Sequence, residues 1–441
     1  MSTRRGKIGC AFASLLVAAA TLSASTTLDQ AVARALAKDR GLKSQVLNEE
    51  ASKANRDFAA RQKLFHVDLA GSYRYATDAV EVTAANFPFS QLFHIPSDQV
   101  FLSTSKSTYD LKLALVQPIW TGGMLANSVK VEEARQAAQS DQTQVLRVQV
   151  AGQVKTSYYT YRLLAARKKS LEALLETLDI HVKRIEALYR EDLTRRSDLL
   201  ETQAKLEETR MSIEEVSQQM AKEKITFETL CDIPPEDIDP AAAEVVLDYA
   251  ASRAEFEARH PILKAMDAQA AALDLSGKVV AASRLPQVTG FGEFHYARPG
   301  LNFFEQTWKA YGLAGLSLTI PIFNLNRVDR DKAVIDVQRR QLENQRAQVL
   351  LDAEKALKQL YEAKQSLETR AASADKLIAL AREGADLKEK LYAENQVSNL
   401  DYLAALADLE RYRSLKVELA VQLELVKVAV NATIGKTGER P

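Results

Sequence analysis

The chain is poor in the residues that interrupt helices and in those that crosslink a fold. Its 441 residues include only 16 glycines, 11 prolines and 2 cysteines, and aromatic residues make up 7%. The charges of the 58 basic and 58 acidic residues cancel. The chain therefore has neither the basic surplus typical of a nucleic-acid-binding protein nor the acidic run typical of a solvating tail. What remains is rich in Ala, Leu, Gln, Glu, Lys and Arg, a composition typical of long helices and coiled coils.

Long apolar runs are missing after the N-terminal region. No later segment has the roughly 18 uncharged apolar residues that a helical membrane span needs, so such a span is excluded. At the N-terminus, three basic residues precede an apolar run from Ile8 to Ala20 and a stretch of small residues. This order is typical of a secretory signal peptide, which we expect to occupy residues 1–25. A mature chain would keep only Cys231 and would therefore contain no internal disulfide.

The sequence repeats itself at a fixed spacing. Pro118 in LALVQPIWTGG and Pro321 in LSLTIPIFNLN lie 203 positions apart, and so do Tyr189 and Tyr392. Further identities at this spacing are Glu191/Glu394, Asp198/Asp401, Leu200/Leu403, Ala204/Ala407, Leu206/Leu409, Glu207/Glu410 and Arg210/Arg413. One spacing held over about 90 residues predicts a duplicated structural unit.

The repeats and the helix-breaking residues divide the chain into parts. Three prolines between residues 231 and 240 mark a linker, because helix propensity falls there. Each repeat should consist of a helix, a β-hairpin and a long helical hairpin. We expect a signal peptide at 1–25, a first repeat at 26–232 (β-hairpin 66–119, helical hairpin 120–232), a linker at 233–252, a second repeat at 253–435 (β-hairpin 286–321, helical hairpin 322–435) and a tail at 436–441.

Alternation predicts the strands of the two β-hairpins. In VDLAGSYRY every second residue from Val67 to Tyr75 is apolar, aromatic or glycine, and STYDLKLALVQ alternates in the same way from Tyr109. The second repeat carries matching segments near 287–296 and 308–320, with a hairpin loop 18 residues shorter. Such segments of about ten residues, with aromatics near one end, are typical of membrane-spanning strands that have a lipid face and a lumen face.

Apolar residues at three- and four-residue spacing follow each β-hairpin. They run from Trp120 to Arg190 and from Val328 to Ala393, which predicts helices of roughly 105 and 100 Å at about 1.5 Å per residue. In the first helix the seam consists of Leu171, Leu174, Leu178, Val182, Ile185 and Leu188. A helix this long needs partners along its whole length, so we expect oligomerisation. Before the first β-hairpin we expect one helix from Leu28 to about Leu64.

The duplicated layout, the QPIWTGG strand-to-helix junction and the turn signature with Tyr392, Asp401 and Leu403 together resemble the TolC-type outer-membrane efflux proteins, the outer-membrane factors. The resemblance extends from about Leu28 to Ile434. It implies a mostly α fold with a β-barrel portion, in which each protomer gives long coiled-coil helices and four transmembrane strands. Three protomers would complete a 12-stranded barrel and an α-helical tunnel.

The same resemblance implies a function. Such proteins are passive exit ducts of tripartite efflux or type I secretion systems, placed in the outer membrane of Gram-negative bacteria with the tunnel in the periplasm. The implied partners are two further copies of the chain, outer-membrane lipid, a periplasmic adaptor (membrane-fusion) protein and an inner-membrane pump. Neither a cofactor nor a nucleic acid is implied.

The resemblance also assigns entrance residues. Asp401 aligns with an aspartate of the periplasmic gate, Asp198 is its repeat partner, and Tyr392 matches a tyrosine that helps to close the entrance. Three copies of Asp401 would form a carboxylate ring that favours cations. The alternative is a solvated acidic residue that caps the first turn of a helix. The basic partner expected near Tyr392 is replaced by Val397, and a second acidic ring is not supported because Ala404 occupies its position.

The tips of the two helical hairpins are the expected contacts for the adaptor. Relatives commonly place glycine where this chain has Asp192 and Asn395, and Asp and Asn are the next-best residues for a left-handed turn. The expected contact residues are Asp192, Leu193, Thr194, Asn395, Gln396, Val397 and Ser398.

Catalytic and metal-binding motifs are missing from the sequence. It has no GxSxG, HExxH or phosphate-binding glycine loop, and its five histidines lack ligand spacing. We therefore predict that the protein has no catalytic, cofactor-binding or metal site and is not an enzyme. The alternative to an export duct is a secreted periplasmic structural coiled-coil protein without a membrane barrel, and the four alternating segments argue against it. The exported substrate stays open among drugs, metal ions, small molecules and proteins.

Overall fold

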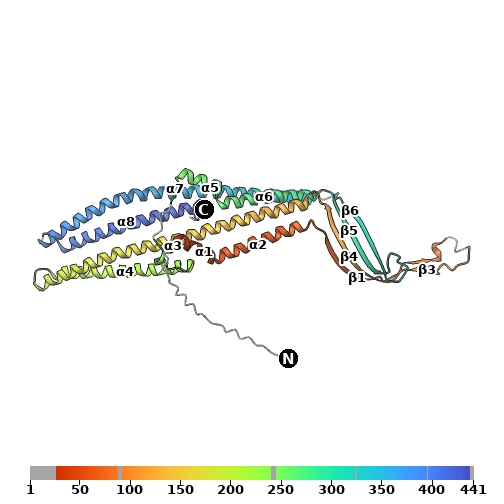
Figure 1. The fold of residues 1–441 in the computed structure, drawn as a ribbon, viewed down its shortest axis with the longest axis horizontal. Coiled ribbons are helices and arrows are strands. Elements are labelled where there is room, and N and C mark those ends of the chain that lie inside the picture. The colour runs from red at the N-terminus through yellow and green to blue at the C-terminus, as the bar shows by residue number, and fades with distance from the viewer. Residues whose placement is uncertain (1–25, 88–91, 240–244, 323–324, 395, 438–441) are drawn as a thin grey trace, which may run out of the picture. The chain divides into compact units, whose positions relative to one another are not determined.

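The computed structural model describes residues 26–87, 92–239, 245–322, 325–394 and 396–437. The predicted signal peptide therefore lies outside the described residues. In chain order the elements are α1 (Leu28–Lys38), α2 (Arg40–Arg61), β1 (His66–Tyr75), β2 (Glu81–Thr83), η1 (Ala84–Asn86), β3 (Val100–Ser103), β4 (Ser107–Trp120), α3 (Met124–Arg190), α4 (Arg196–Cys231), η3 (Pro235–Asp237), α5 (Tyr249–Arg259), α6 (Pro261–Ala282), β5 (Gln287–Arg298), β6 (Lys309–Thr319), α7 (Leu325–Ala393) and α8 (Asn399–Thr433) (Figure 1). The predicted mostly helical fold with a smaller strand portion is confirmed.

The chain divides into two compact units. The hairpin unit comprises Met1–Lys38, Gln153–Glu244 and Ala371–Glu424; the sheet unit comprises Asp39–Gly152, Val245–Arg370 and Leu425–Pro441. None of the described helices has an apolar stretch of the length that a membrane span requires.

The first helix differs from the single helix predicted from Leu28 to about Leu64. It is broken at Asp39, whose side chain accepts a hydrogen bond from the backbone N–H of Leu42 at 2.6 Å and so caps α2. A short polar side chain at this position satisfies a free N–H of a new helix, which is why continuous helix propensity did not reveal the break. The second repeat breaks 221 positions later at His260, whose Nδ1 accepts from the N–H of Ile262 at 3.2 Å.

The sheet unit contains a four-stranded antiparallel sheet in the order β1-β4-β5-β6. Leu69 pairs with Leu113, Leu113 with Phe294, and Phe294 with Gly312, so one face continues across the strands. A separate pair, β2 and β3, lies within the longer connection of the first β-hairpin. Because side chains alternate along a strand, this register sorts them into one largely apolar face and one more polar face.

The helices of the sheet unit pack around their own apolar core. Its buried residues include Phe256 of α5, Leu263 of α6, Leu357 of α7 and Val430 of α8. The hydroxyl of Tyr361 bonds both Ser252, at 2.8 Å, and the backbone carbonyl of Leu247. Full burial of each large aliphatic side chain contributes roughly 2 kcal/mol, so this core fixes how the four helices meet.

The hairpin unit is held by two clusters that involve α3, α4, α7 and α8. One contains Ile185, Tyr392, Tyr402 and Leu409; the other contains Leu174, Leu178, Val182, Leu206 and Leu403. Four residues of the apolar seam read from the sequence of α3 are buried here, with Leu178 only 1% exposed and Ile185 fully covered, whereas Leu171 and Leu188 are half-buried. Figure 1 shows α3 running into the short turn before α4, and α7 into the turn before α8.

Candidate functional site

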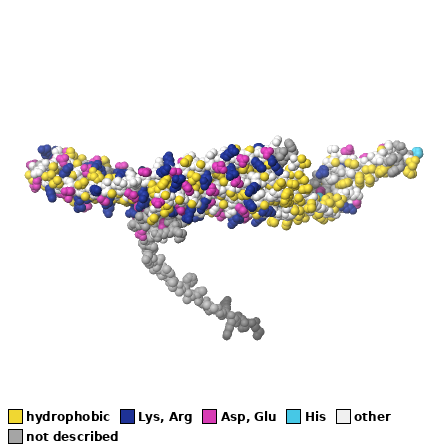
Figure 2. All heavy atoms as spheres, turned by 90° about the horizontal axis from the view of Figure 1, so that it is seen from above, with side chains coloured by type: hydrophobic (Ala, Val, Ile, Leu, Met, Phe, Trp, Pro, Cys, Tyr) yellow, Lys and Arg dark blue, Asp and Glu magenta, His cyan; other side chains and the backbone are white. Residues whose placement is uncertain are grey.

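The outward face of the sheet is apolar and exposed. Leu69 is 69% exposed, Phe294 53% and Leu316 72%, although all three lie in regular strands. Further exposed residues of this face are Val67, Tyr73, Tyr75, Tyr109, Leu111, Leu113, Leu115, Tyr296 and Leu318. Figure 2 shows hydrophobic side chains gathered over the strands, whereas the surfaces of the helices carry many charged groups. A continuous apolar surface of this extent marks a face that is covered by lipid or by another protein.

Aromatic rings cross one end of this face. The Tyr73 and Tyr109 rings are 4.9 Å apart, Tyr109 lies 5.8 Å from Trp308, and Tyr296 stacks on Trp308 at 5.0 Å. These rings belong to β1, β4, β5 and the residue before β6, and all of them lie at the strand ends next to the hairpin loops. Amphipathic rings at one level across neighbouring strands are typical of a membrane–water boundary.

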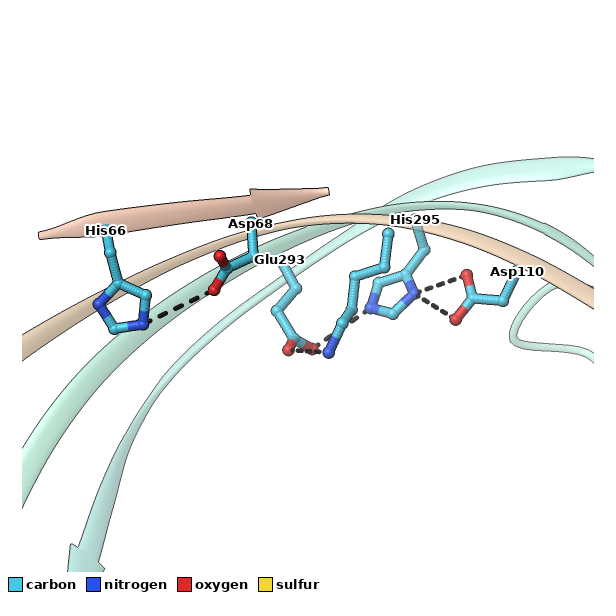
Figure 3. A network of polar contacts seen from close by, with 6 residues as sticks. His66, Asp68, Asp110, Glu293 and His295 are labelled. Atoms are coloured by element: carbon cyan, nitrogen blue, oxygen red, sulfur yellow. Dashed lines mark hydrogen bonds and ion pairs between the residues drawn. The ribbon is translucent and has the colours of Figure 1, made fainter. Parts of the chain in front are cut away.

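The opposite face carries a network of charged side chains (Figure 3). Lys112 Nζ lies 2.9 Å from Glu293 Oε1. The His295 ring lies 2.9 Å from Asp110 on one side and 3.3 Å from Glu293 on the other. His66 and Asp68 form a looser pair at 3.7 Å, on β1. These groups pair with one another, and among the described residues no cluster of His, Cys, Asp and Glu has the geometry to hold a metal ion.

The sheet is open at both sides within one chain. Among the residues that the structure describes, β1 is hydrogen-bonded in this sheet only to β4 and β6 only to β5, so each presents a row of backbone donors and acceptors to the outside. An edge of this kind binds another strand readily, and in an apolar environment it requires one.

The first hairpin tip uses Asp192 in a left-handed conformation. Its φ is 57°, its N–H donates to the carbonyl of Tyr189 at 3.1 Å, and the N–H of Leu193 reaches the carbonyl of Leu188 at 2.9 Å. These two bonds form the Schellman motif that ends many helices. At the second tip the N–H of Gln396 reaches the carbonyl of Leu391 at 2.8 Å, and the predicted turn residue Asn395 lies outside the described residues.

The predicted adaptor contacts differ in exposure. Leu193 is 62% exposed, whereas Val397 packs against the core cluster that contains Tyr392. Thr194 is half-buried, and Ser398 is bound to Asp401. The two tips therefore present different surfaces although their positions correspond in the repeat.

Two of the three predicted gate residues lie close to each other in the hairpin unit. Tyr392 is buried, and its burial raises the pKa of its hydroxyl, while a hydrogen bond to Thr194 acts in the opposite direction. Thr194 Oγ1 also donates to Asp198 Oδ2 at 2.9 Å. Thr194 thus lies between the Tyr392 hydroxyl of α7 and the Asp198 carboxylate of α4.

The third predicted gate residue, Asp401, is exposed and caps α8. Its carboxylate accepts hydrogen bonds from the Ser398 hydroxyl at 2.6 Å and from the Ser398 N–H at 3.3 Å, while Ser398 Oγ accepts from the N–H of Asp401 at 3.1 Å. This reciprocal arrangement is a capping box. The bonds from Ser398 and the charge of Lys388 lower the pKa of Asp401. The carboxylate therefore stays ionised at neutral pH.

A buried polar cluster next to Tyr392 was missed by the sequence reasoning. His181 Nε2 lies 2.8 Å from Asn399 Oδ1, and Asn399 Nδ2 donates to Thr202 Oγ1 at 3.0 Å and to the carbonyl of Asp198 at 3.1 Å. His181 is 4% exposed, Asn399 2% and Thr202 fully covered. His181 falls in the same three- and four-residue spacing as Leu174, Leu178 and Ile185, so a polar residue at a seam position was the available signal.

The sequence and the fold of this chain resemble those of known proteins. The sequence profile described as "Outer membrane efflux protein" matches residues 31–231, a little under half of the chain. A comparison with curated proteins gives no match. Among solved structures, CusC, which forms a transmembrane channel, matches with a TM-score of 0.77 at 15% identity over 93% of this chain and 92% of its own.

Two further structures agree. VceC, an outer membrane protein of Vibrio cholerae, matches with a TM-score of 0.74 at 16% identity, covering 93% of this chain and 96% of VceC. The MtrE outer membrane channel of Neisseria gonorrhoeae matches with a TM-score of 0.73 at 14% identity, covering 94% and 90%. At such identities the likeness establishes the fold. Together with the family profile, it confirms the resemblance to outer-membrane efflux proteins predicted from the sequence, and it does not favour a structural rod.

Proposed function

Starting from that resemblance to the outer-membrane efflux proteins, we propose that the chain is the passive outer-membrane exit duct of a tripartite export system. The observation that carries the proposal is the four-stranded sheet, which is apolar on its exposed face, crossed by aromatic rings at one end and unpaired at both edges. A lipid bilayer offers no hydrogen bonds to the open edges, so they must pair with further strands.

Three copies of the chain supply those strands. Joined edge to edge through β1 and β6, they would form a closed 12-stranded barrel with the Leu69 face in lipid and the His295 face lining the lumen. The helices then extend into the periplasm of a Gram-negative bacterium. This arrangement needs the division into a signal peptide (1–25) and two repeats (26–232 and 253–435), which we retain as part of the proposal.

In this proposal the duct does not itself provide the energy for transport. An inner-membrane pump provides the energy, and a periplasmic adaptor binds the hairpin tips around Leu193 and Gln396. Asp198, Tyr392 and Asp401 are the proposed gate. We assign no catalytic step to the chain, in keeping with the channels that it resembles.

The test is membrane fractionation followed by mass determination in detergent. Expressed with its N-terminal segment in a Gram-negative host, the protein should be recovered in the outer membrane as a species of three copies, each of 48.8 kDa before any processing. A monomer in the soluble periplasmic fraction would overturn the proposal.

A point variant sharpens this experiment. Leu69→Lys places a charge on the proposed lipid face and should cost about 2–4 kcal/mol if the site lies near the bilayer midplane. Ser72→Lys in the same strand has its side chain on the opposite face and should assemble normally. Equal assembly of the two variants would contradict the assigned orientation of the sheet.

A further inference from the structure

We propose that His181, Asn399 and Thr202 form an acid-sensitive latch that ties α3 and α4 to α8 beside the entrance residues. The inference rests on the proposed function, since it supplies the closing contact of the proposed gate. It also answers a question that the sequence raises, because Val397 stands where a basic partner of Tyr392 was expected.

The hydrogen bonds fix the orientation of each side chain in this latch. The carbonyl of Asp198 can only accept, so the atom of Asn399 that faces it at 3.1 Å must be the amide nitrogen. Thr202 donates its own hydrogen to the same carbonyl at 2.7 Å and therefore accepts from Asn399. The amide oxygen of Asn399 is left for His181, whose Nε2 must consequently carry a proton.

His181 is held in the neutral form by its surroundings. Burial lowers its pKa below the ordinary value, and the positive charge of Arg184 acts in the same direction, whereas the bond to Asn399 and the charge of Glu389 oppose them. Arg184 and Glu389 lie 3.5 Å apart and partly neutralise each other. The hydrogen-bond partner of the imidazole, Asn399, is uncharged.

The groups that face His181 come from every helix packed against it. Arg184 lies on α3, Glu389 and Tyr392 on α7, and Asn399 and Tyr402 on α8. The α4 groups, Thr202 and the Asp198 carbonyl, are connected to the imidazole through Asn399. The rings of Tyr392 and Tyr402 lie 5.8 and 4.9 Å from the imidazole. Neither tyrosine becomes anionic in the acid range, because burial raises the pKa of both hydroxyls. Both tyrosines therefore stay neutral over this range and add no charge beside the ring.

The direction of the pH effect follows from this burial. When the helices separate, water reaches His181 and its pKa returns towards the ordinary value of about 6.5. Above that pH the imidazole is neutral in both arrangements and the latch is fully stable. As the pH falls below about 6.5, a proton binds His181 more strongly in the separated arrangement than in the packed one. Each unit of difference between the two pKa values shifts the equilibrium towards separation by up to about tenfold. Acid therefore opens the latch.

The experiment measures the open fraction of single channels of the full-length protein in planar bilayers from about pH 8 to about pH 5, the range in which histidine titrates. We expect the native protein to open increasingly below about pH 6.5. His181→Gln keeps a donor for Asn399 and cannot titrate, so its open fraction should stay constant. Thr202→Val removes one partner of Asn399 and should raise the open fraction at neutral pH while keeping the acid response.

A matched control comes from His260, a half-buried histidine whose pKa is also lowered. Burial brings His260 to a pKa of about 4, and it lies in the sheet unit at the start of α6. His260→Asn retains an acceptor for the helix cap and should keep the acid response of the native protein.

The outcomes separate the latch from the duct. Channels whose His181→Gln profile follows that of the native protein would overturn the latch alone. If His260→Asn lost the acid response and His181→Gln kept it, the response would depend on His260. That result would overturn the latch as well. Absence of channels for every protein would overturn the proposed duct and the latch with it. Asp401 is present in all variants, and its lowered pKa keeps it ionised through this range.

Discussion

The two repeats share their helix bounds to within two residues and yet differ where function is expected. α1 and α5 correspond 221 positions apart, as do α2 and α6, while α4 begins at Arg196 and α8 begins 203 positions later at Asn399. At the same spacing the buried His181 corresponds to Gly384, beside which an added Cβ would meet nothing within 4 Å. Duplication thus preserved the scaffold, and substitutions at single seam positions made the two helical hairpins chemically distinct.

The paired aspartates show how a small change redirects a side chain. Asp401 follows Ser398, which can donate and accept, so the two residues cap α8. In the first repeat the corresponding N-cap residue is Arg195, which makes no side-chain cap. The Asp198 carboxylate is therefore free to accept from Thr194, whose hydroxyl also meets Tyr392. Equal sequence positions take unequal roles because the residue three positions earlier differs.

The largest expected effect comes from proline in the buried seam. Leu178→Pro removes a backbone hydrogen bond, clashes with the preceding turn and costs at least about 3 kcal/mol before any lost packing. We expect no assembled protein and no export, measured by the amount of detergent-stable oligomer in the membrane. Ala381→Pro, at the equivalent position of the second repeat, should be as damaging; normal assembly of either would show that its hairpin is dispensable. Ile180→Ala, at a residue that is 63% exposed, is the control.

The second-largest effect is expected at the two tyrosines that correspond in the repeats, Tyr189 and Tyr392. Tyr392 is 8% exposed and contacts both His181 and Tyr402, whereas Tyr189 is 36% exposed. Truncating a buried aromatic residue costs about 3–5 kcal/mol, so Tyr392→Ala should lower the unfolding temperature in detergent far more than Tyr189→Ala. Circular dichroism during heating measures both. Equal shifts would mean that the hairpin tips pack symmetrically.

The two aspartates can be separated by neutral substitutions. Asp401→Asn retains an acceptor for the cap of α8 but removes the charge, so any loss of cation preference or cation block in planar bilayers reports the proposed carboxylate ring. Asp401→Ala should additionally cost about 1 kcal/mol through the lost cap. Asp198→Asn, whose parent carboxylate is half-buried against Thr194, should change ion preference less. An unaltered preference in Asp401→Asn would leave that residue with its capping role alone.

The smallest effect is expected at the first hairpin tip. Asp192 has a φ of 57°, which strains any residue with a side chain, so Asp192→Gly should stabilise the turn by at most about 1 kcal/mol. A small rise in the unfolding temperature is the expected result. A fall would indicate that the Asp192 side chain makes a contact that outweighs the backbone strain.

Several features of this protein followed from the sequence alone. Periodicity and repeat spacing predicted the helices and the strands, since a residue pattern needs only its own element to be recognised: α3 and α7 end at Arg190 and Ala393 as predicted. The break at Asp39 was not foreseen, because one capping side chain weighs little against a long run of helix-forming residues.

The tertiary structure decided which polar residues are buried together. His181, Thr202 and Asn399 are separated by 21 and 197 positions, and no pattern along one helix links them. They meet only where α3, α4 and α8 pack; burial then lowers the pKa of the histidine, and the hydrogen bond to Asn399 fixes its tautomer. The sequence determined the elements, since local hydrogen bonding and amphipathic spacing are properties of neighbouring residues; packing between distant helices determined the electrostatics, since desolvation exists only once the chain has folded.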